Sequence, residues 1–305
     1  MIDLSIIIVS YNTKQFLLDS VQSVIKTTKN ISYEIIIVDN NSRDGSVEAI
    51  RNFQFSIFNS QSNTKNKNFQ IIKNGENLGF SKANNIGVGK AQGRYILFLN
   101  SDTIVYEKTL ETMVRFMDNH KDCGIATCRV NLINGEIDDA SHRGFPTPVR
   151  SLFYFSGLSK IFSNSLFFNG YHLGYRNLSK IHEIEACAGA FMIVRKEAGK
   201  DIGWFDKDYF FYGEDLDFCY KIKNKGWKIY YVPVVSILHY KGVSGGIKKI
   251  SQNITTANRE TKKRVLDARF NAMEIFYRKN YINKYPWIVT WLVIKGIALI
   301  SFLQH

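Results

Sequence analysis

Through its first 120 residues the chain alternates short β-branched apolar runs with helical patterns, and each apolar run ends in polar residues. The runs that predict strands are residues 4–9, 35–38, 69–72 and 95–99. Apolar residues at helical spacing predict helices over residues 14–29, 80–91 and 107–120. Strands that alternate with helices are typical of an α/β fold with a mainly parallel sheet.

The second half of the chain is less regular. Residues 134–185 show little periodicity, residues 189–195 and 228–232 predict two more strands, and residues 256–282 predict a long helix. Residues 59–68 are polar and of low complexity, so we expect a surface loop there. The 305 residues are 45% hydrophobic, which is enough for a substantial core. Four cysteines without a CxxC pair favour a reducing compartment, with each thiol buried as a small hydrophobe.

The net charge of +13 is concentrated toward the C-terminus. Residues 241–284 hold 11 basic and 3 acidic residues, and residues 286–303 are almost wholly apolar, with Lys295 as their one charged residue. A basic stretch followed by an apolar one favours an anionic membrane surface, whereas nucleic acid is the rival partner for so basic a chain. We prefer the membrane because the apolar segment has no use on nucleic acid. Whether this segment enters the membrane, lies on it or packs on the protein stays open.

The first apolar run is shorter than the core of a signal peptide, and no basic region precedes it. We therefore interpret it as a strand and expect the protein in the cytoplasm, peripheral at the inner face of the cell membrane.

In open α/β sheets, ligands bind outside the carboxyl ends of the strands. Small polar segments follow the four predicted strands: residues 10–12 (SYN), 39–42 (DNNS), 74–79 (NGENLG) and 100–102 (NSD). This edge suits a polar, hydroxyl-rich ligand, although helix capping explains Asp39 and Asp102 equally well. The chain has no GxGxxG after its first strand and no GxxxxGK[ST], which argues against a dinucleotide-binding dehydrogenase and a P-loop enzyme. A phosphate-bearing ligand would need another cationic partner, and a metal ion on Asp102 could supply it.

A second polar group lies in residues 204–217, where three carboxylates fall within four positions beside several aromatic residues. If the following segment is helical, Glu214 and Asp217 share one face and Asp215 points elsewhere. Acidic residues also favour a helix N-terminus, which is the simpler explanation. We prefer a functional cluster, because the aromatic neighbours make full solvation of these carboxylates unfavourable. His239 follows another apolar run. We consider it functional only as a partner of Asp102 in binding a divalent cation.

Six segments in order carry a resemblance to a known family. They are SIIIVSYN (5–12), IIIVDNNSRDGS (35–46), NGENLGFSKANNIG (74–87), YILFLNSD (95–102), ACAGAFMIVRK (186–196) and GWFDKDYFFYGEDLDFCYKIKNKGWKIYYVP (203–233), followed by His239. The chain resembles family 2 glycosyltransferases, in particular the rhamnosyltransferase-like branch used in bacterial surface polysaccharide assembly. Each motif alone is weak, but six in the family's order are a specific signal.

The resemblance implies a GT-A fold over residues 1–240, with a nucleotide-sugar half (1–103) and an acceptor and catalytic half (104–240). A basic helical tail with an apolar end (241–305) follows. In the family's pattern the donor would be bound by Ser10, Asn12, Asp39, Asn77, Gly79, Asn84, Asn85 and Asp102. Asp102 would also hold a Mg²⁺ or Mn²⁺ ion, with His239 as the second protein ligand. Asp215 would be the general base, with Glu214 as the alternative, and the acceptor would contact Arg143, Trp204, Tyr212 and Asp217.

One departure affects the cation. Many relatives carry Asp-x-Asp where this chain has Asn100, Ser101 and Asp102. The missing carboxylate weakens the protein's hold on a metal ion until the donor diphosphate adds its own oxygens.

The reaction implied is an inverting transfer of a sugar, rhamnose from dTDP-rhamnose as the first choice, from a nucleotide diphosphate to a hydroxyl of a glycan or lipid-linked acceptor in O-antigen or capsule assembly. The alternatives are a UDP-hexose donor, an inactive GT-A domain that only binds sugar nucleotide or glycan, and a nucleotidyltransferase that makes the activated sugar.

Overall fold

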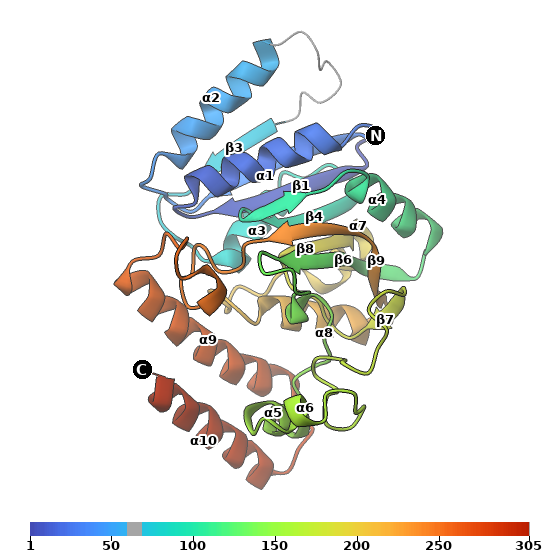
Figure 1. Ribbon diagram of the computed structural model, residues 1–305, viewed down its shortest axis with the longest axis vertical. Helices are drawn as coiled ribbons and strands as arrows, with labels where there is room; N and C mark the ends of the chain where they lie inside the picture. The colour runs from blue at the N-terminus through green and yellow to red at the C-terminus, as the bar shows by residue number, and fades with distance from the viewer. Residues whose placement is uncertain (60–68, 305) are drawn as a thin grey trace.

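The computed structural model describes residues 1–59 and 69–304, in which a central sheet is covered by helices on both faces (Figure 1). The expected surface loop at 59–68 lies outside the described residues, except for Asn59 at the end of a helix. The first four strands are β1 (Leu4–Ser10), β2 (Tyr33–Asp39), β3 (Phe69–Lys73) and β4 (Tyr95–Asn100). They pair in the order β3-β2-β1-β4 and are all parallel, as the alternating pattern predicts.

The rest of the sheet is mixed. It contains β5 (Thr103–Val105), β6 (Cys123–Leu132), β7 (His182–Ile184), β8 (Phe191–Arg195) and β9 (Lys228–His239). β8 runs antiparallel to β4 and β6, and β9 runs parallel to β6 but antiparallel to β5 and β7. β9 is longer than its sequence pattern predicts and continues through Pro233, which falls where the β6–β9 register shifts. Proline within a sheet is tolerated at such an irregularity.

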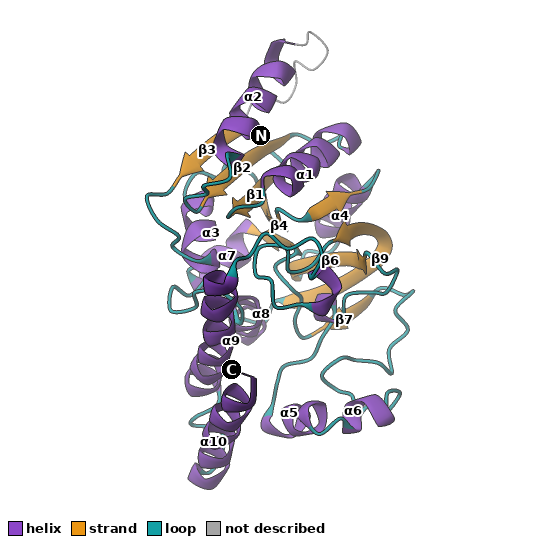
Figure 2. Ribbon diagram, turned by 60° about the vertical axis from the view of Figure 1, so that its left-hand side comes forward, coloured by secondary structure: helices purple, strands orange, loops and turns teal. Residues whose placement is uncertain are grey.

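The helices of the described residues complete the layers (Figure 2). They are α1 (Lys14–Thr27), α2 (Ser46–Asn59), α3 (Phe80–Val88), α4 (Thr109–Asn119), α5 (Pro148–Phe155), α6 (Leu158–Ile161), α7 (Lys196–Ile202), α8 (Glu214–Asn224), α9 (Arg259–Asn280) and α10 (Trp287–Gln304), with 3₁₀ turns at Asp139–Ser141 and Lys249–Ser251. α2 was not expected from the sequence, nor were α5 and α6 inside the aperiodic stretch.

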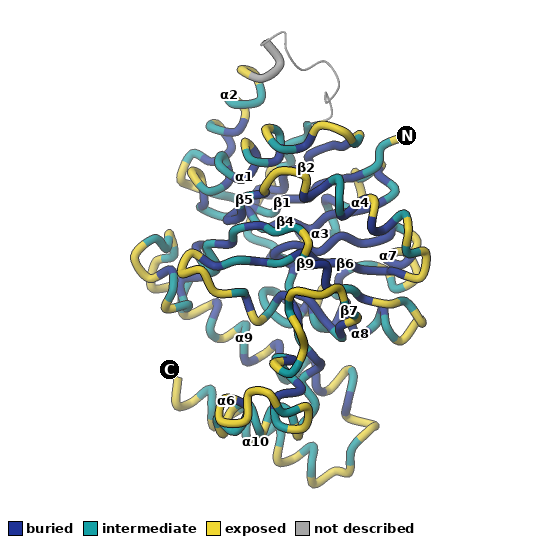
Figure 3. Tube along the Cα trace, turned by 45° about the vertical axis from the view of Figure 1, so that its right-hand side comes forward, coloured by how far each residue is buried: buried dark blue, intermediate teal, exposed yellow. Residues whose placement is uncertain are grey.

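Alternation along each strand divides the core between the two faces of the sheet. On β1, Ile6 and Ile8 join the cluster under α1 and α4, whereas Ile7 joins the cluster under α7 and α8. α9 contributes Ala272 and Phe276 to this second cluster, so the start of the basic tail packs as part of the core. Buried residues accordingly run through the sheet and into α9 (Figure 3).

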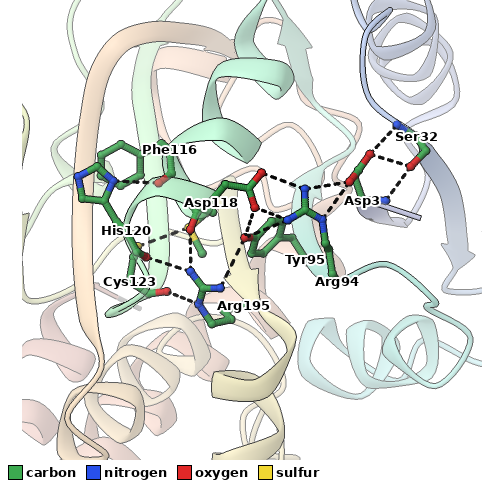
Figure 4. Close-up of polar contacts among 10 residues, drawn as sticks. Asp3, Ser32, Arg94, Tyr95, Phe116, Asp118, His120, Cys123 and Arg195 are labelled. Carbon is green, nitrogen blue, oxygen red and sulfur yellow. Dashed lines mark hydrogen bonds and ion pairs between the residues drawn. The ribbon is translucent and has the colours of Figure 1, made fainter. Parts of the chain in front are cut away.

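A charged cluster holds together the strand ends that lie away from the predicted site (Figure 4). Arg94, at the start of β4, pairs with Asp3 and Asp118, and Tyr95 donates to Asp118 at 2.8 Å. The buried guanidinium of Arg195 donates to three carbonyl oxygens, those of Met117, His120 and Cys123, at 2.7–2.9 Å. We call Asp3, Arg94, Tyr95, Asp118 and Arg195 the strand-end clamp. It ties β1, β4, β6 and β8 to the end of α4.

Candidate functional site

The carboxyl ends of the parallel strands form one row. Ser10 is in register with Asp39 on β2, and the residue before Ser10 is in register with Asn100 on β4. Ser10 and Ser101 are linked through Thr13, whose hydroxyl lies 3.1 Å from Ser10 Oγ and 3.0 Å from Ser101 Oγ. The predicted ligand-binding edge is therefore continuous across these strands.

Asp39 is buried in this row, and only one of its two carboxylate oxygens has a hydrogen-bond partner among the described residues. Its Oδ2 accepts a hydrogen bond from the backbone of Ser42 at 2.8 Å. Its Oδ1 is buried and has no hydrogen-bond partner among the described residues. Asn12 has φ +53°, and its side-chain oxygen accepts from the backbone of Arg43 at 2.8 Å, which holds the 39–43 turn against the end of β1. A buried acceptor without a partner is unfavourable unless a ligand or water donates to it.

The turn before α3 brings the predicted donor loop to the acidic segment. Gly79 has φ +82°, and a Cβ built there would lie 2.4 Å from the carbonyl oxygen of Phe210. Asn77 Oδ1 accepts from the backbone of Gly79 at 3.0 Å, and the backbone of Phe80 donates to the Phe210 carbonyl at 2.8 Å. Only glycine allows both the left-handed turn and this close approach.

The side chains of Asn84 and Asn85 on α3, which were expected to line the donor pocket, are both hydrogen-bonded to backbone groups. Asn84 donates to the carbonyl of Phe80 within the helix at 3.0 Å. Asn85 uses its amide on the backbone of Phe205, donating to the carbonyl at 2.8 Å and accepting from the N–H at 3.1 Å. Asn85 thus joins α3 to the segment that leads to Glu214 and Asp215.

Asp102 and His239 meet directly, because β5 pairs with the end of β9. His239 Nε2 lies 3.3 Å from Asp102 Oδ1, and His239 Nδ1 lies 3.3 Å from Asp138 Oδ2. Lys241 Nζ completes the group at 2.7 Å from Asp138 Oδ1. The backbone N–H of Val243 donates to Asp102 Oδ2 at 3.4 Å.

These contacts shift the protonation of the group. Burial disfavours the imidazolium, but the carboxylates of Asp102 and Asp138 outweigh it and raise the pKa of His239 to about 9. Burial works against an ionised Asp102, yet His239 lowers its pKa below the usual value. The pKa of Asp138 is likewise lowered, since His239 and Lys241 outweigh its burial. At neutral pH the group is a buried imidazolium between two carboxylates.

Glu214 and Asp215 begin α8. Arg143 donates to Asp215 Oδ2 at 2.6 Å, and both side chains are 12% exposed. Burial works to lower the pKa of Arg143, but Asp215 raises it above its usual value. Glu214 Oε2 is buried without a hydrogen-bond partner among the described residues. Burial, followed by the charge of Asp215, raises the pKa of Glu214 to about 8, so this carboxyl is protonated at neutral pH.

The charges of both carboxylate groups act on the buried Tyr212. It has φ +69°, and burial, together with the charges of Glu214, Asp102 and Asp215, raises its pKa. Lys248 Nζ lies 5.7 Å from the centre of the Tyr212 ring. Burial, with the nearby cations Arg269 and Lys241, lowers the pKa of Lys248 to about 8. Residue 239 thus contacts residue 102, and the charges of residues 102 and 215 act on one tyrosine.

Two residues predicted for the acceptor lie elsewhere. Trp204 packs on Gly199, where a Cβ would lie 2.3 Å from its ring, and its ring centre is 6.3 Å from that of Phe98. Asp217 is 1% exposed and binds Lys221 at 2.7 Å and Asn280 at 3.0 Å, which joins α8 to the end of α9. Both side chains are used in packing, so we leave them out of the acceptor set.

Three cationic or acidic neighbours of the site were missed from the sequence: Asp138, Lys241 and Lys248. Asp138 and Lys248 lie in irregular segments whose periodicity carries no information on their position. Lys241 could have been predicted from the sequence. It follows His239 by two residues, so a strand that places His239 at the site also places Lys241 near it.

The fit of a divalent cation depends on Asp102. Its carboxylate suits Mg²⁺ or Mn²⁺, but its partner His239 is protonated and has both ring nitrogens in contact with carboxylates. Among residues 1–59 and 69–304, no group of three or more His, Cys, Asp or Glu side chains is arranged to hold a metal ion.

Known proteins show clear similarities to this chain. The profile of "Glycosyl transferase family 2" matches residues 5–203. The chain is 31% identical to the rhamnosyltransferase WbbL of Escherichia coli K12 over 169 residues, 53% of this chain and 61% of that protein. It is 32% identical to the minor teichoic acid biosynthesis protein GgaB of Bacillus subtilis over 121 residues, 39% of this chain and 12% of that protein. These matches span less than two thirds of either relative.

Solved structures share the fold. GalNAc-T7 crystallised with UDP, GalNAc and Mn²⁺ superposes with a TM-score of 0.59 at 18% identity, over 91% of this chain and 50% of that one. S. aureus TarS 1–349 in complex with UDP-GlcNAc gives 0.56 at 15% identity, over 97% and 72%. The predicted GT-A fold, an α/β sheet flanked by helices, is confirmed. The profile match covers well over half of the sequence, and the chain therefore belongs to glycosyl transferase family 2.

Proposed function

We propose that the protein is an inverting glycosyltransferase that moves a sugar from a nucleotide diphosphate to a hydroxyl of a glycan or lipid-linked acceptor in surface polysaccharide assembly. The observation that supports this proposal is that Asp102, which follows the parallel strand β4, contacts His239, and that the charges of Asp102 and of the Glu214–Asp215 pair act on the same buried Tyr212. Ligands of open α/β sheets bind at this edge.

The donor is proposed to be dTDP-rhamnose, supported by the similarity to a rhamnosyltransferase. A UDP-hexose is the second candidate, since two structural neighbours were crystallised with UDP or UDP-GlcNAc. The unpartnered Oδ1 of Asp39 would accept from the nucleotide, and Ser10, Asn12, Asn77 and Gly79 would shape the pocket around it. Asn84 and Asn85 would act indirectly, by fixing α3.

A Mg²⁺ or Mn²⁺ ion at Asp102 would supply electrostatic stabilisation of the leaving diphosphate. His239 becomes its second protein ligand only after losing its proton, so most ligands would come from the donor itself. Lys241, which pairs with Asp138 at 2.7 Å, and Lys248, on which the charge of Lys241 acts, would add positive charge to the same side of the site.

Asp215 is proposed to accept the proton of the attacking hydroxyl. Its carboxylate is held by Arg143 at 2.6 Å, so the acceptor has to share or displace this contact before Asp215 can act. Arg143 and Tyr212 are the proposed acceptor contacts that remain. Glu214 is proposed to stay protonated and to limit the negative charge next to Asp215.

The test is turnover of a panel of nucleotide sugars, with released nucleotide diphosphate measured with and without an acceptor extract. Transfer from one donor supports the proposal, and chelation with EDTA should reduce it. Binding of a nucleotide sugar with no release under any condition would identify a binding domain instead. Release of diphosphate from a nucleoside triphosphate would identify a nucleotidyltransferase.

Membrane association is part of the proposal. α10 is long enough to cross a bilayer, and its mean hydropathy of 1.7 is high enough. With the basic residues that precede it, α10 supports a protein that works peripherally at the inner face of the cell membrane.

A further inference from the structure

Two apolar segments far apart in the sequence lie at the same end of the molecule. Figures 1 and 2 show α5 and α6 at the same end of the molecule as α10, opposite α2, and Figure 3 shows α6 and α10 at that end. The first segment is residues 148–168, which contain α5, α6 and the following turn, and the second is α10. We call these two segments the apolar end.

The apolar end exposes large hydrophobic side chains on both segments. In residues 148–168 they are Val149, Leu152, Phe155, Ile161, Phe162, Leu166 and Phe167, and on α10 they are Trp287, Ile288, Trp291, Leu292, Leu299, Phe302 and Leu303. Seven of these fourteen side chains are more than 60% exposed. So many exposed apolar side chains at one end mark an interaction surface.

A chain of aromatic contacts fixes the two segments relative to each other. Phe145, just before α5, contacts Tyr220 at a ring distance of 5.0 Å, and Tyr220 contacts Tyr281 at 5.8 Å. Tyr281 in turn contacts Tyr285, just before α10, at 5.8 Å. Both segments are therefore anchored to the same aromatic cluster in the core. This common anchor places them where they can bind the same partner.

Charge indicates what this partner is. Residues 148–168 and α10 contain no Asp or Glu. Their charged residues are Arg150, which is paired with Glu185 at 2.6 Å, Lys160 and Lys295, and the basic Arg176, Lys180 and Lys284 follow or precede the two segments. A second copy of the chain would bring these positive charges against one another. Anionic lipid head groups would neutralise them while the hydrophobic side chains enter the bilayer surface.

The packing of α10 decides how it would meet the bilayer. One face of α10 lies along α9, with the Tyr277 hydroxyl 3.0 Å from the Thr290 hydroxyl and with Val293 and Ile294 partly buried. α9 carries seven basic and three acidic residues. A spanning α10 would have to leave α9 or draw these charges into hydrocarbon, which is costly. An in-plane helix keeps α9 in water.

We propose that residues 148–168 and α10 form one membrane-docking face that lies flat on an anionic bilayer. The face deepens the membrane association of the proposed function but is argued from its own exposure, charge and packing, and its purpose, delivery of a lipid-linked acceptor, rests on the proposed function. Residues 148–168 begin five residues after Arg143, the partner of Asp215, so this segment links the bilayer to the acceptor side of the site.

The experiment measures co-sedimentation of the whole chain with vesicles of phosphatidylcholine containing roughly one third phosphatidylglycerol. We expect wild type to bind, and Leu152→Glu combined with Phe167→Glu to weaken vesicle binding at least about tenfold, since two large side chains lose their burial in lipid. Trp291→Glu should do the same from α10. The matched control is Phe55→Glu, an exposed aromatic on α2 at the other end of the molecule, which should bind like wild type.

UDP and dTDP binding, followed by thermal shift, checks in every variant that the fold is intact and reports separately on the proposed nucleotide site. Full vesicle binding by the Leu152/Phe167 variant would overturn the two-part face, and an equal loss in the Phe55 control would show a non-specific effect. A wild-type dimer in solution that the same substitutions dissociate would assign the face to a second copy and refute the membrane. Vesicle binding with no nucleotide binding would leave the docking face standing and refute the proposed transfer from a sugar nucleotide.

Discussion

Glu214 and Asp215 are neighbours in the chain but meet different surroundings. Asp215 faces the guanidinium of Arg143, whereas Glu214 Oε2 is buried without a hydrogen-bond partner among the described residues. The sequence predicts both carboxylates as candidates, and it cannot rank them, because Arg143 is 72 residues away. The difference between a paired and a protonated carboxyl arises only from the tertiary packing.

Asp215→Asn should reduce sugar transfer by about 10²–10⁴-fold, because the amide cannot accept the proton of the acceptor hydroxyl. Donor affinity, measured by titration with the nucleotide sugar, should change little. Asp208→Asn, an exposed carboxylate in the same segment, is the control and should keep full activity. Near wild-type transfer by Asp215→Asn would remove it from the role of base.

Glu214→Gln should change how stability depends on pH. The pKa of Glu214 is raised to about 8 in the fold, so folding holds a proton that the unfolded chain releases near its ordinary pKa of 4.5. Wild type therefore loses stability as pH rises from about 5 to 8, by up to about 1.4 kcal/mol per pH unit. Urea unfolding at a series of pH values should show a flatter profile for the glutamine variant. Parallel profiles would mean that Glu214 is ionised in the folded state.

At the scale of elements, local pattern predicts the helices and strands of the first 120 residues well. It fails where the chain is irregular or where tertiary pairing decides. β5 has three residues and exists because it pairs with β9, and α5 begins at Pro148 in a stretch without clear periodicity. β9 continues through Pro233 only because its register with β6 shifts there. None of these causes is visible in a local window.

The turn before α3 gives a test at this scale. Gly79→Ala should destabilise the fold by about 1–3 kcal/mol, through its φ of +82° and the contact with the Phe210 carbonyl, and should weaken nucleotide binding. Gly75→Ala, in the same loop, has no atom within 4 Å of the added Cβ and serves as the control. Thermal unfolding with and without dTDP or UDP measures both effects. Equal stability and equal nucleotide binding of the two variants would mean that the contact between residue 79 and the Phe210 carbonyl does not affect the free energy of unfolding.

At the scale of the whole molecule, the binding edge and the strand-end clamp lie at opposite ends of β1 and β4. Arg195 is 8% exposed and donates to three carbonyl oxygens, so no apolar side chain can replace it without leaving buried acceptors unpaired. The position of this clamp follows from topology, because β8 runs antiparallel to β4 and returns to the amino end of β4.

Arg195→Met should lower the free energy of unfolding by about 2–4 kcal/mol, while UDP affinity of the folded protein stays unchanged. Arg115→Met, an exposed arginine on α4, should change stability by less than about 0.5 kcal/mol. Chemical denaturation and isothermal titration give the two quantities. A loss of nucleotide affinity without a loss of stability would contradict the separation.

The strand-end clamp has a consequence for how such a protein can diversify. The hydrogen bonds and ion pairs of the clamp lie at the end of the sheet opposite the proposed sugar-binding edge. Substitutions at the binding edge therefore leave these interactions intact. Loops there can be exchanged to recognise a new sugar while the scaffold keeps its reserve of stability.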